Sequence, residues 1–168
     1  RRPIDYSHRL ELRESINLDN KEPTPEFFQN LLSTYQDGRI KLFLTRQLLR
    51  YRREQASLFL HGSYHPLEVK GEKLPHVVAF QRILNGTTVI VCTPRFPYQL
   101  LSGSFIPAVG ESVWTDTMLT LDNSLKGASY LNVLTKDSVN SILIDHQPML
   151  SLAEVFKVFP VAVMEQKL

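Results

Sequence analysis

Several features that often carry catalysis or ligand binding are absent from this sequence of 168 residues. Its 7 glycines form no phosphate-binding loop and no dinucleotide fingerprint, and no Gly-x-Ser-x-Gly elbow is present. The one cysteine, Cys92, excludes an internal disulfide, and its place in an apolar run predicts a buried, unreactive thiol. The sequence therefore lacks the marks of P-loop, dinucleotide-binding and serine-hydrolase proteins, and we expect no cofactor.

Charge and hydropathy exclude further classes of partner. The net charge is only +2, which gives no support for binding nucleic acid through bulk charge. No apolar run approaches the ~20 residues that span a bilayer, so we expect no membrane association. The sparse cysteine fits a reducing, cytoplasmic setting. Because the sequence begins with Arg1 and not with Met, we expect it to be a piece of a longer protein.

Residues that could hold a metal or cleave a glycosidic bond are few. His61 and His65 are four positions apart, but Pro66 argues against a helix that would align them, so we predict no metal site. Glycoside hydrolysis needs two carboxylates that face each other across the scissile bond. Asp116 and Asp122 are the obvious pair, but both lie near the ends of an expected strand, where solvated turn acids are common. We therefore predict no catalytic residue.

Hydrophobic periodicity divides the chain into a helical segment, 1–62, and a β-rich domain, 63–168. Asp5 and Thr24 are expected helix N-caps, and a long amphipathic helix is expected from about Ile40 to Ser57. The apolar stripe of that helix comprises Ile40, Phe43, Leu44, Leu48 and Tyr51. Its basic residues, which we expect to be solvated or ion-paired, are Arg39, Lys41, Arg46, Arg50, Arg52 and Arg53.

The second part of the chain predicts antiparallel β structure. Asn85-Gly86 between two β-rich runs is a strong hairpin pattern. The fold class is therefore predicted as α+β, with N-terminal helices followed by an antiparallel β-sandwich-like domain. The expected strands are 64–69, 76–83, 87–92, 117–121, 130–133, 141–144 and 161–165, and a short helical turn is expected after Ser151.

Several short motifs, in order along the chain, resemble the C-terminal portion of maltooligosyltrehalose synthases, relatives of the α-amylases. They are Arg1-Arg2-Pro3-Ile4-Asp5-Tyr6, Asp37-Gly38-Arg39-Ile40-Lys41-Leu42, Leu58-Phe59 with Gly62-Ser63-Tyr64 and Pro66-Leu67, His76-Val77-Val78-Ala79-Phe80-Gln81-Arg82, Pro94-Arg95, Trp114-x-Asp116-Thr117 and Phe159-Pro160-Val161-Ala162-Val163. No motif of the family is present in 101–113 or 122–127.

The resemblance implies a function in trehalose biosynthesis. Such an enzyme isomerises the reducing-end α-1,4 linkage of a maltodextrin to α,α-1,1, by an intramolecular transglucosylation that uses a carboxylate nucleophile and an acid/base carboxylate. These carboxylates would all precede Arg1. The resemblance therefore implies a non-catalytic C-terminal fragment, inactive alone, in which 1–62 is the tail of the catalytic (β/α)8 barrel and 63–168 is the C-terminal β-domain.

The resemblance also suggests substrate-binding residues. Arg1 and Arg2 would lie in a loop on the active-site face, where a guanidinium could bind sugar hydroxyls or a carboxylate; alternatively, one of them pairs with Asp5. Lys41 is a further candidate, with a solvated lysine as the simpler interpretation. An alternative function is a stand-alone carbohydrate-binding module, with Trp114, Tyr64 or Tyr98 stacking on sugar rings unless these side chains belong to the core or an interface.

The expected partners follow from the same resemblance. The missing barrel and a maltodextrin are the primary ones. Without the barrel, the apolar stripe of the long helix would be left uncovered, so we expect either that it packs onto the β-sheet or that the chain associates with a second copy of itself.

Overall fold

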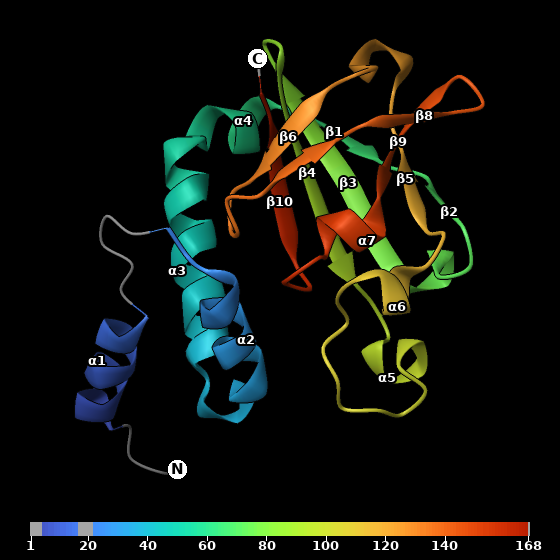
Figure 1. Ribbon diagram of the computed structural model, residues 1–168. Coiled ribbons are helices and arrows are strands. Elements are labelled where there is room, and N and C mark those ends of the chain that lie inside the picture. Colours follow the sequence, from blue (N-terminus) through green and yellow to red (C-terminus); the bar gives the residue numbers. More distant parts are fainter. Residues whose placement is uncertain (1–4, 17–21, 168) are drawn as a thin grey trace. The chain divides into compact units, whose positions relative to one another are not determined.

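The computed structural model describes residues 5–16 and 22–167 and divides into two compact units. We call Arg1–Glu54 the helical unit and Gln55–Leu168 the β unit. The α+β class predicted from the sequence is confirmed, with helices first and antiparallel sheets after them (Figure 1). Among the described residues, no helix is long and apolar enough to cross a membrane.

The helical unit contains α1 (Tyr6–Ser15), α2 (Pro25–Ser33), a 3-10 turn η1 (Tyr35–Asp37) and α3 (Arg39–Glu54). Both predicted N-caps are present: the Asp5 carboxylate accepts from the backbone N–H of His8, and the Thr24 hydroxyl accepts from that of Phe27. The predicted long helix, however, is interrupted at Gln55 and continues as the short helix α4 (Ala56–His61), which belongs to the β unit.

Three phenylalanines form the centre of the helical unit. Phe43 of α3 packs edge-on against Phe27 and Phe28 of α2, with ring centroids 5.3 and 5.8 Å away. Phe43 and Tyr51 are buried in the structure, and Ile40, Leu44 and Leu48 are half-buried. Phe43, one residue of the apolar stripe, is therefore covered by α2 within the helical unit.

The first helix is more exposed than its sequence pattern predicts. That pattern places Tyr6, Leu10 and Leu12 on or near the inner side of the helix. In the structure Tyr6 and Leu10 are 71% and 53% exposed, Leu12 is half-buried, and α1 buries none of its side chains. The reason is composition: His8, Arg9, Glu11 and the other polar residues leave α1 too few apolar positions to make a continuous buried face.

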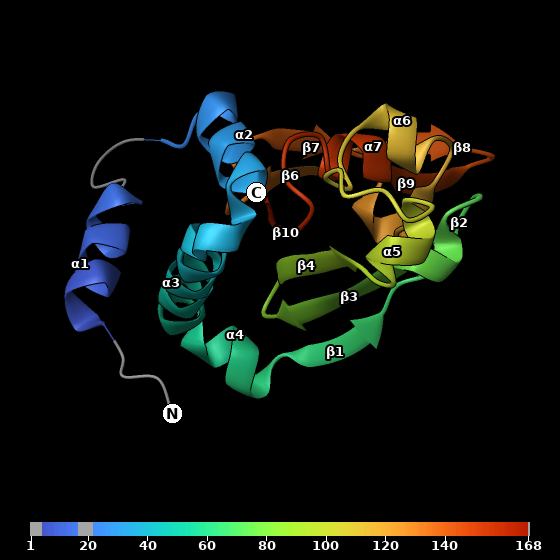
Figure 2. The ribbon, with the colours of Figure 1, turned by 90° about the horizontal axis from the view of Figure 1, so that it is seen from below.

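The β unit contains two antiparallel sheets. In the six-stranded sheet the order is β1-β3-β4-β10-β6-β7, and in the four-stranded sheet it is β2-β5-β9-β8 (Figures 1 and 2). The strands of the first sheet are β1 (Ser63–Pro66), β3 (Val77–Leu84), β4 (Thr87–Pro94), β6 (Ser129–Asn132), β7 (Ser138–Asn140) and β10 (Ala162–Gln166). Those of the second are β2 (Val69–Lys70), β5 (Met118–Thr120), β8 (Ile142–Ile144) and β9 (Gln147–Ser151).

Short helical segments complete the β unit. They are α5 (Pro97–Leu100), α6 (Glu111–Trp114) and α7 (Leu152–Val155), with 3-10 turns η2 (Leu74–His76) and η3 (Asn123–Leu125). The predicted turn after Ser151 is thus present as α7, although the Ser151 side chain makes no capping hydrogen bond. In Figure 2, α6 and α7 lie side by side at one end of the unit.

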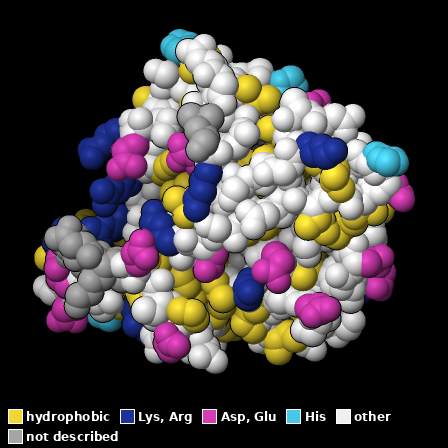
Figure 3. All heavy atoms as spheres, turned by 45° about the horizontal axis from the view of Figure 1, so that its top comes forward, with side chains coloured by type: hydrophobic (Ala, Val, Ile, Leu, Met, Phe, Trp, Pro, Cys, Tyr) yellow, Lys and Arg dark blue, Asp and Glu magenta, His cyan; other side chains and the backbone are white. Residues whose placement is uncertain are grey.

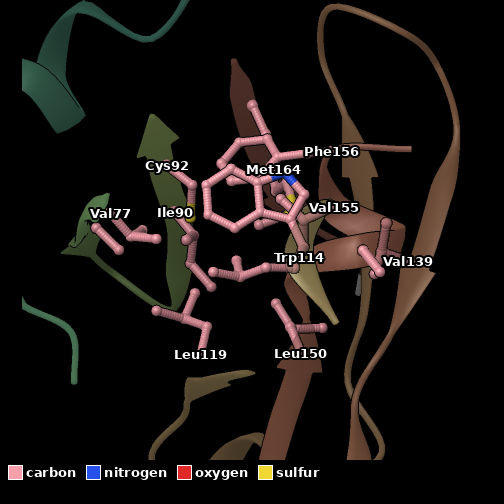
Figure 4. Close-up of a cluster of buried hydrophobic side chains, with 14 of the residues drawn as sticks. Val77, Ile90, Cys92, Trp114, Leu119, Val139, Leu150, Val155, Phe156 and Met164 are labelled. Atoms are coloured by element: carbon pink, nitrogen blue, oxygen red, sulfur yellow. The ribbon is translucent and has the colours of Figure 1, made fainter. Parts of the chain in front are cut away.

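Both sheets contribute to one buried cluster. It takes Ile90 and Cys92 from β4, Met164 from β10, and Leu119 and Leu150 from the second sheet. Figure 4 shows the indole of Trp114 at the centre of this cluster, beside Phe156. Cys92 is fully buried, as predicted, and burial raises the pKa of its thiol to about 12, which leaves it protonated and unreactive.

Candidate functional site

Of the residues predicted to bind substrate, Lys41 belongs to the helical unit and Trp114 to the β unit. Arg1 and Arg2 lie outside the described residues. Lys41 is an exposed residue of α3, in the helical unit. Trp114 is completely buried in the β unit, where its indole N–H donates to the carbonyl oxygen of Ala108 at 2.9 Å. Its ring faces are therefore not available to a sugar, and the structure places this residue in the core.

The other two aromatic candidates are exposed. Tyr64 is 55% exposed and Tyr98 is 70% exposed. The Tyr64 ring packs on Phe80, with centroids 4.9 Å apart, and the Arg82 guanidinium lies 5.9 Å from its centroid. One face of Tyr64 is thus occupied by the protein itself, which supports an interpretation of this residue as a structural contact of the β1–β3 pair.

The carboxylates of Asp116 and Asp122 each accept a hydrogen bond from a backbone N–H group. Asp116 accepts a hydrogen bond from the backbone N–H of Glu72 at 3.0 Å, which is the main reason why its pKa is lowered. Hydrogen bonding by Ser124, through its side chain and its backbone N–H, lowers the pKa of Asp122. A general acid needs a raised pKa near neutrality, so neither carboxyl is suited to that role.

The histidines likewise form no metal centre. His65 Nε2 lies 2.9 Å from the hydroxyl of Ser63, and the described residues contain no group of three or more His, Cys, Asp or Glu side chains that could hold a metal ion. Structural zinc sites use four such ligands and catalytic sites at least three, so this part of the chain offers no metal centre.

The basic residues of α3 form a solvated, ion-paired face. Arg50 pairs with Glu54 at 2.9 Å, one helical turn further along, and Arg39 pairs with Asp37 at 2.7 Å. Figure 3 shows Lys and Arg side chains at the surface with carboxylates beside several of them. Exposed ion pairs of this kind are common on helix surfaces and give no support for nucleic-acid binding.

A groove of about 910 Å³ is present in the helical unit. It lies between α1 and the start of α3, and Lys41 lines it together with Tyr6, Leu10 and Leu42. Its walls combine exposed apolar side chains with charged ones of both signs, including Asp37. Lys41 is thus a predicted binding residue that lines a concavity of the described structure.

A smaller and more polar cavity, of about 420 Å³, lies in the β unit. Its lining residues are His65, Gln81, Ile83, Gly86, Thr88, Asp122, Ser124, Leu125 and Gln166. Strand register explains how the sheet residues meet. Gln81 is paired with Ile90, a core residue, so the two side chains lie on the same face of the sheet. Ile83 and Thr88, the next pair but one, share that face.

The wall opposite the sheet comes from the segment around η3, which brings Asp122, Ser124 and Leu125 to the cavity. Gln81 is only 6% exposed, and its Oε1 atom is buried without a hydrogen-bond partner in the described structure. A buried carbonyl oxygen left unpaired costs about 1–3 kcal/mol. Three other buried side-chain atoms among the described residues also lack a partner, and they belong to His76, Thr120 and Tyr130, none of which lines this cavity. The sequence did not predict this cavity, because the β-strand alternation does not distinguish Gln81 from any other strand residue.

The family-like motifs fall mainly in structural contacts. Arg82 donates to the carbonyl oxygen of Gly62 at 3.0 Å, which joins two of the motifs. A Cβ at Gly62 would collide with the carbonyl oxygen of Leu58, so only glycine fits there. In the Trp114-x-Asp116-Thr117 motif, Asp116 and Thr117 accept from the backbone N–H groups of Glu72 and Lys73 and so fix the turn before η2.

Comparison with known proteins gives one informative match. No model of a known protein family matches this chain, and no curated protein sequence does. The fold is similar to part of a mutant maltooligosyltrehalose synthase from Arthrobacter ramosus, with a TM-score of 0.65 and 23% sequence identity. The similarity covers 99% of this chain and 17% of the other. The chain thus has the fold of a small part of that enzyme, and at this identity the likeness shows the fold alone.

Proposed function

We propose that this chain is a non-catalytic C-terminal part of an enzyme like maltooligosyltrehalose synthase, whose active carboxylates lie in a preceding barrel. The observation that carries the proposal is the fold likeness over 99% of the chain, in the same enzyme that the sequence motifs resemble. Sequence motifs and backbone shape are different observations, and both support a relationship to that enzyme.

The structural use of the motifs supports the non-catalytic part of the proposal. The Asp37 carboxylate accepts a hydrogen bond from the backbone N–H of Arg39 at 2.8 Å and a second one from Nε of the Arg39 guanidinium at 2.7 Å. These two bonds fix the start of α3. Arg82 and Asp116 also form hydrogen bonds with backbone groups. These charged motif residues therefore hold turns and strands in place. A domain that stabilises a neighbouring catalytic barrel needs such residues, and it needs no acid/base pair of its own.

In this proposal the reaction is the rearrangement of an α-1,4 linkage to α,α-1,1 at the reducing end of a maltodextrin, performed by the barrel. Arg1 and Arg2 would extend onto the active-site face and donate hydrogen bonds to sugar hydroxyls, and Lys41 would line the groove beside α1. The barrel would be the main partner. The protein would act in the cytoplasm, a location that agrees both with an α-glucan substrate and with a reduced Cys92 thiol.

A chimera tests the proposal. The segment of the Arthrobacter ramosus enzyme that corresponds to this chain is replaced by this chain, and the chain alone is assayed in parallel with maltopentaose. Formation of an α,α-1,1 linkage consumes a reducing end, so loss of reducing ends measures the reaction. We expect no loss with the chain alone and measurable loss with the chimera.

Two controls make the result decisive. The first is a chimera with Phe28→Asp, which places a charge in the buried centre of the helical unit and should lower activity by disrupting folding. The second is a chimera with the exposed substitution Gln99→Leu, which should keep activity. A folded chimera without activity, or conversion of maltopentaose by the chain alone, would refute the proposal.

A further inference from the structure

The polar cavity of the β unit has features that the proposed scaffold role does not require. Its volume of about 420 Å³ falls in the range of pockets that hold small molecules, about 300–1,000 Å³. Gln81, which is only 6% exposed, is one of its lining residues, and its Oε1 atom has no hydrogen-bond partner in the described structure. A ligand hydroxyl in the cavity would supply the donor that this oxygen lacks.

The chemistry of the lining residues selects the class of ligand. Amide and hydroxyl side chains of Gln81, Thr88, Gln166 and Ser124 can each donate and accept hydrogen bonds, and the carboxylate of Asp122 accepts. A vicinal diol also donates and accepts on adjacent atoms, so a sugar ring can match several of these groups together. Ile83 and Leu125 provide apolar surface for the C–H face of such a ring.

The same lining argues against other ligands. No Lys or Arg is among the lining residues, and Asp122 carries negative charge, so an anion such as phosphate would be repelled. His65 and Asp122 are the only lining residues of the types that commonly bind metals, which is too few for a metal site. A purely apolar ligand would leave the buried amide of Gln81 unpaired.

We infer that this cavity is a secondary binding site for one pyranose unit of a neutral saccharide, with Gln81 and Asp122 as its principal hydrogen-bonding residues. The inference stands on the cavity itself. It rests on the proposed function only for the choice of an α-glucan as the saccharide. The cavity would bind this α-glucan as a secondary site, separate from the active site in the barrel. The site is distinct from the groove lined by Lys41, which belongs to the other unit.

NMR titration of the ¹⁵N-labelled chain tests the inference. Glucose, maltose and trehalose are added separately, and inorganic phosphate is added as an anionic control. We expect saturable shifts at the backbone amides of Gly86 and Ser124 and at the side-chain amide of Gln81 with at least one sugar, and none with phosphate. If the cavity holds only ordered water, no saturable shift will appear at these positions with any sugar. That result would overturn the inference.

Matched variants assign any binding to the cavity. Gln81→Leu removes the buried amide, and Gln99→Leu makes the same change on an exposed residue of α5. Loss of a buried hydrogen bond should weaken binding by about tenfold in Gln81→Leu and leave it unchanged in Gln99→Leu. Thr88→Val, which keeps the side-chain shape at a buried position, provides the same comparison if Gln81→Leu does not fold.

The outcomes separate this inference from the proposed function. Binding that survives both Gln81→Leu and Thr88→Val in folded protein would place the sugar elsewhere and overturn the inference. An active chimera together with no sugar-dependent shifts would remove the cavity as a binding site while leaving the scaffold role intact. Sugar-dependent shifts at the cavity together with a folded but inactive chimera would support the site and refute the scaffold role.

Discussion

At the scale of single residues, the side chains that carry the family resemblance mostly hold backbone in place. Trp114 is the clearest case, because its ring is fully buried and its one polar atom donates to the Ala108 carbonyl oxygen. Sequence reasoning weighed this residue both as a sugar platform and as core, and alternation patterns could not decide between them. The structure decides through exposure, since a stacking platform has to be open on one face.

Replacing Trp114 by Ala should destabilise the protein strongly. It removes a large buried ring that packs on Phe156, with centroids 4.9 Å apart, and leaves the Ala108 carbonyl oxygen without its donor. We expect a loss of about 3–5 kcal/mol in the free energy of unfolding, measured by urea denaturation followed by far-UV circular dichroism. Tyr98→Ala, at a 70% exposed position, is the control and should change stability by about 0.5 kcal/mol or less. Equal losses in the two variants would contradict the assignment of Trp114 to the core.

The Asp37 carboxylate should make stability depend on pH. Hydrogen bonding by the backbone N–H of Arg39 is the main reason why its pKa is lowered in the folded protein. A lowered pKa gives stability that is present above the unfolded value, about 3.9, and is lost as the pH falls through the folded value. The stability of Asp37→Asn should therefore fall less steeply between pH 5 and 2, as measured by urea denaturation at each pH. Some dependence should remain, because the pKa values of Asp116 and Asp122 are also lowered.

The exposed turn residue Asp145 provides the comparison for this measurement. Asp145→Asn makes the same chemical change at a position where the carboxylate accepts no hydrogen bond from a backbone N–H in the described structure. The slope of stability against pH should therefore stay close to that of the unmodified chain. An unchanged slope in Asp37→Asn would show that this cap does not distinguish the folded from the unfolded state.

At the scale of elements, the sequence predicted the caps and turns that a few consecutive residues determine. The Thr24 cap and the Asn85-Gly86 hairpin are present because both are set by a few consecutive residues. Strand β9 was missed because Pro148 lies within it, and a proline in a run argues against a strand. The polar cavity was missed for a different reason: its residues come from four strands and η3, and only strand register brings them together.

The hairpin turn offers a prediction about β3 and β4. Asn85 and Gly86 have φ values of 49° and 84°, both in the left-handed region. A side chain at Gly86 would meet no atom within 4 Å, so the effect of Gly86→Ala is purely conformational. We expect the free energy of unfolding to fall by about 1–2 kcal/mol in thermal or urea denaturation. The matched change Asn85→Gly should be close to neutral, and a neutral Gly86→Ala would mean that the turn adopts another conformation.

At the scale of the whole molecule, the two units differ in how much core each contains. The main buried cluster lies entirely within the β unit, from Val77 to Met164, with Leu67 and Val69 packed against it. Among the described residues of the helical unit, the buried apolar side chains are those of Ile16, Phe28, Leu31, Phe43 and Tyr51. Short helices gain most of their stability from tertiary packing, so the helical unit has little with which to stabilise itself.

We therefore predict that residues 55–168 fold without the helical unit. The trimmed chain should unfold cooperatively in urea, and its amide shifts should match those of the same residues in the full chain, apart from positions near the new terminus. A full chain with Phe28→Asp is the matched variant, because it disrupts the helical unit by burying a charge and leaves the sequence of the β unit unchanged. If the β unit depends only on its own core, both proteins should show the same dispersed β-unit spectrum. Collapse of that spectrum in either protein would mean that the helical unit contributes to the β core, and the chain would then have to be treated as one cooperative domain.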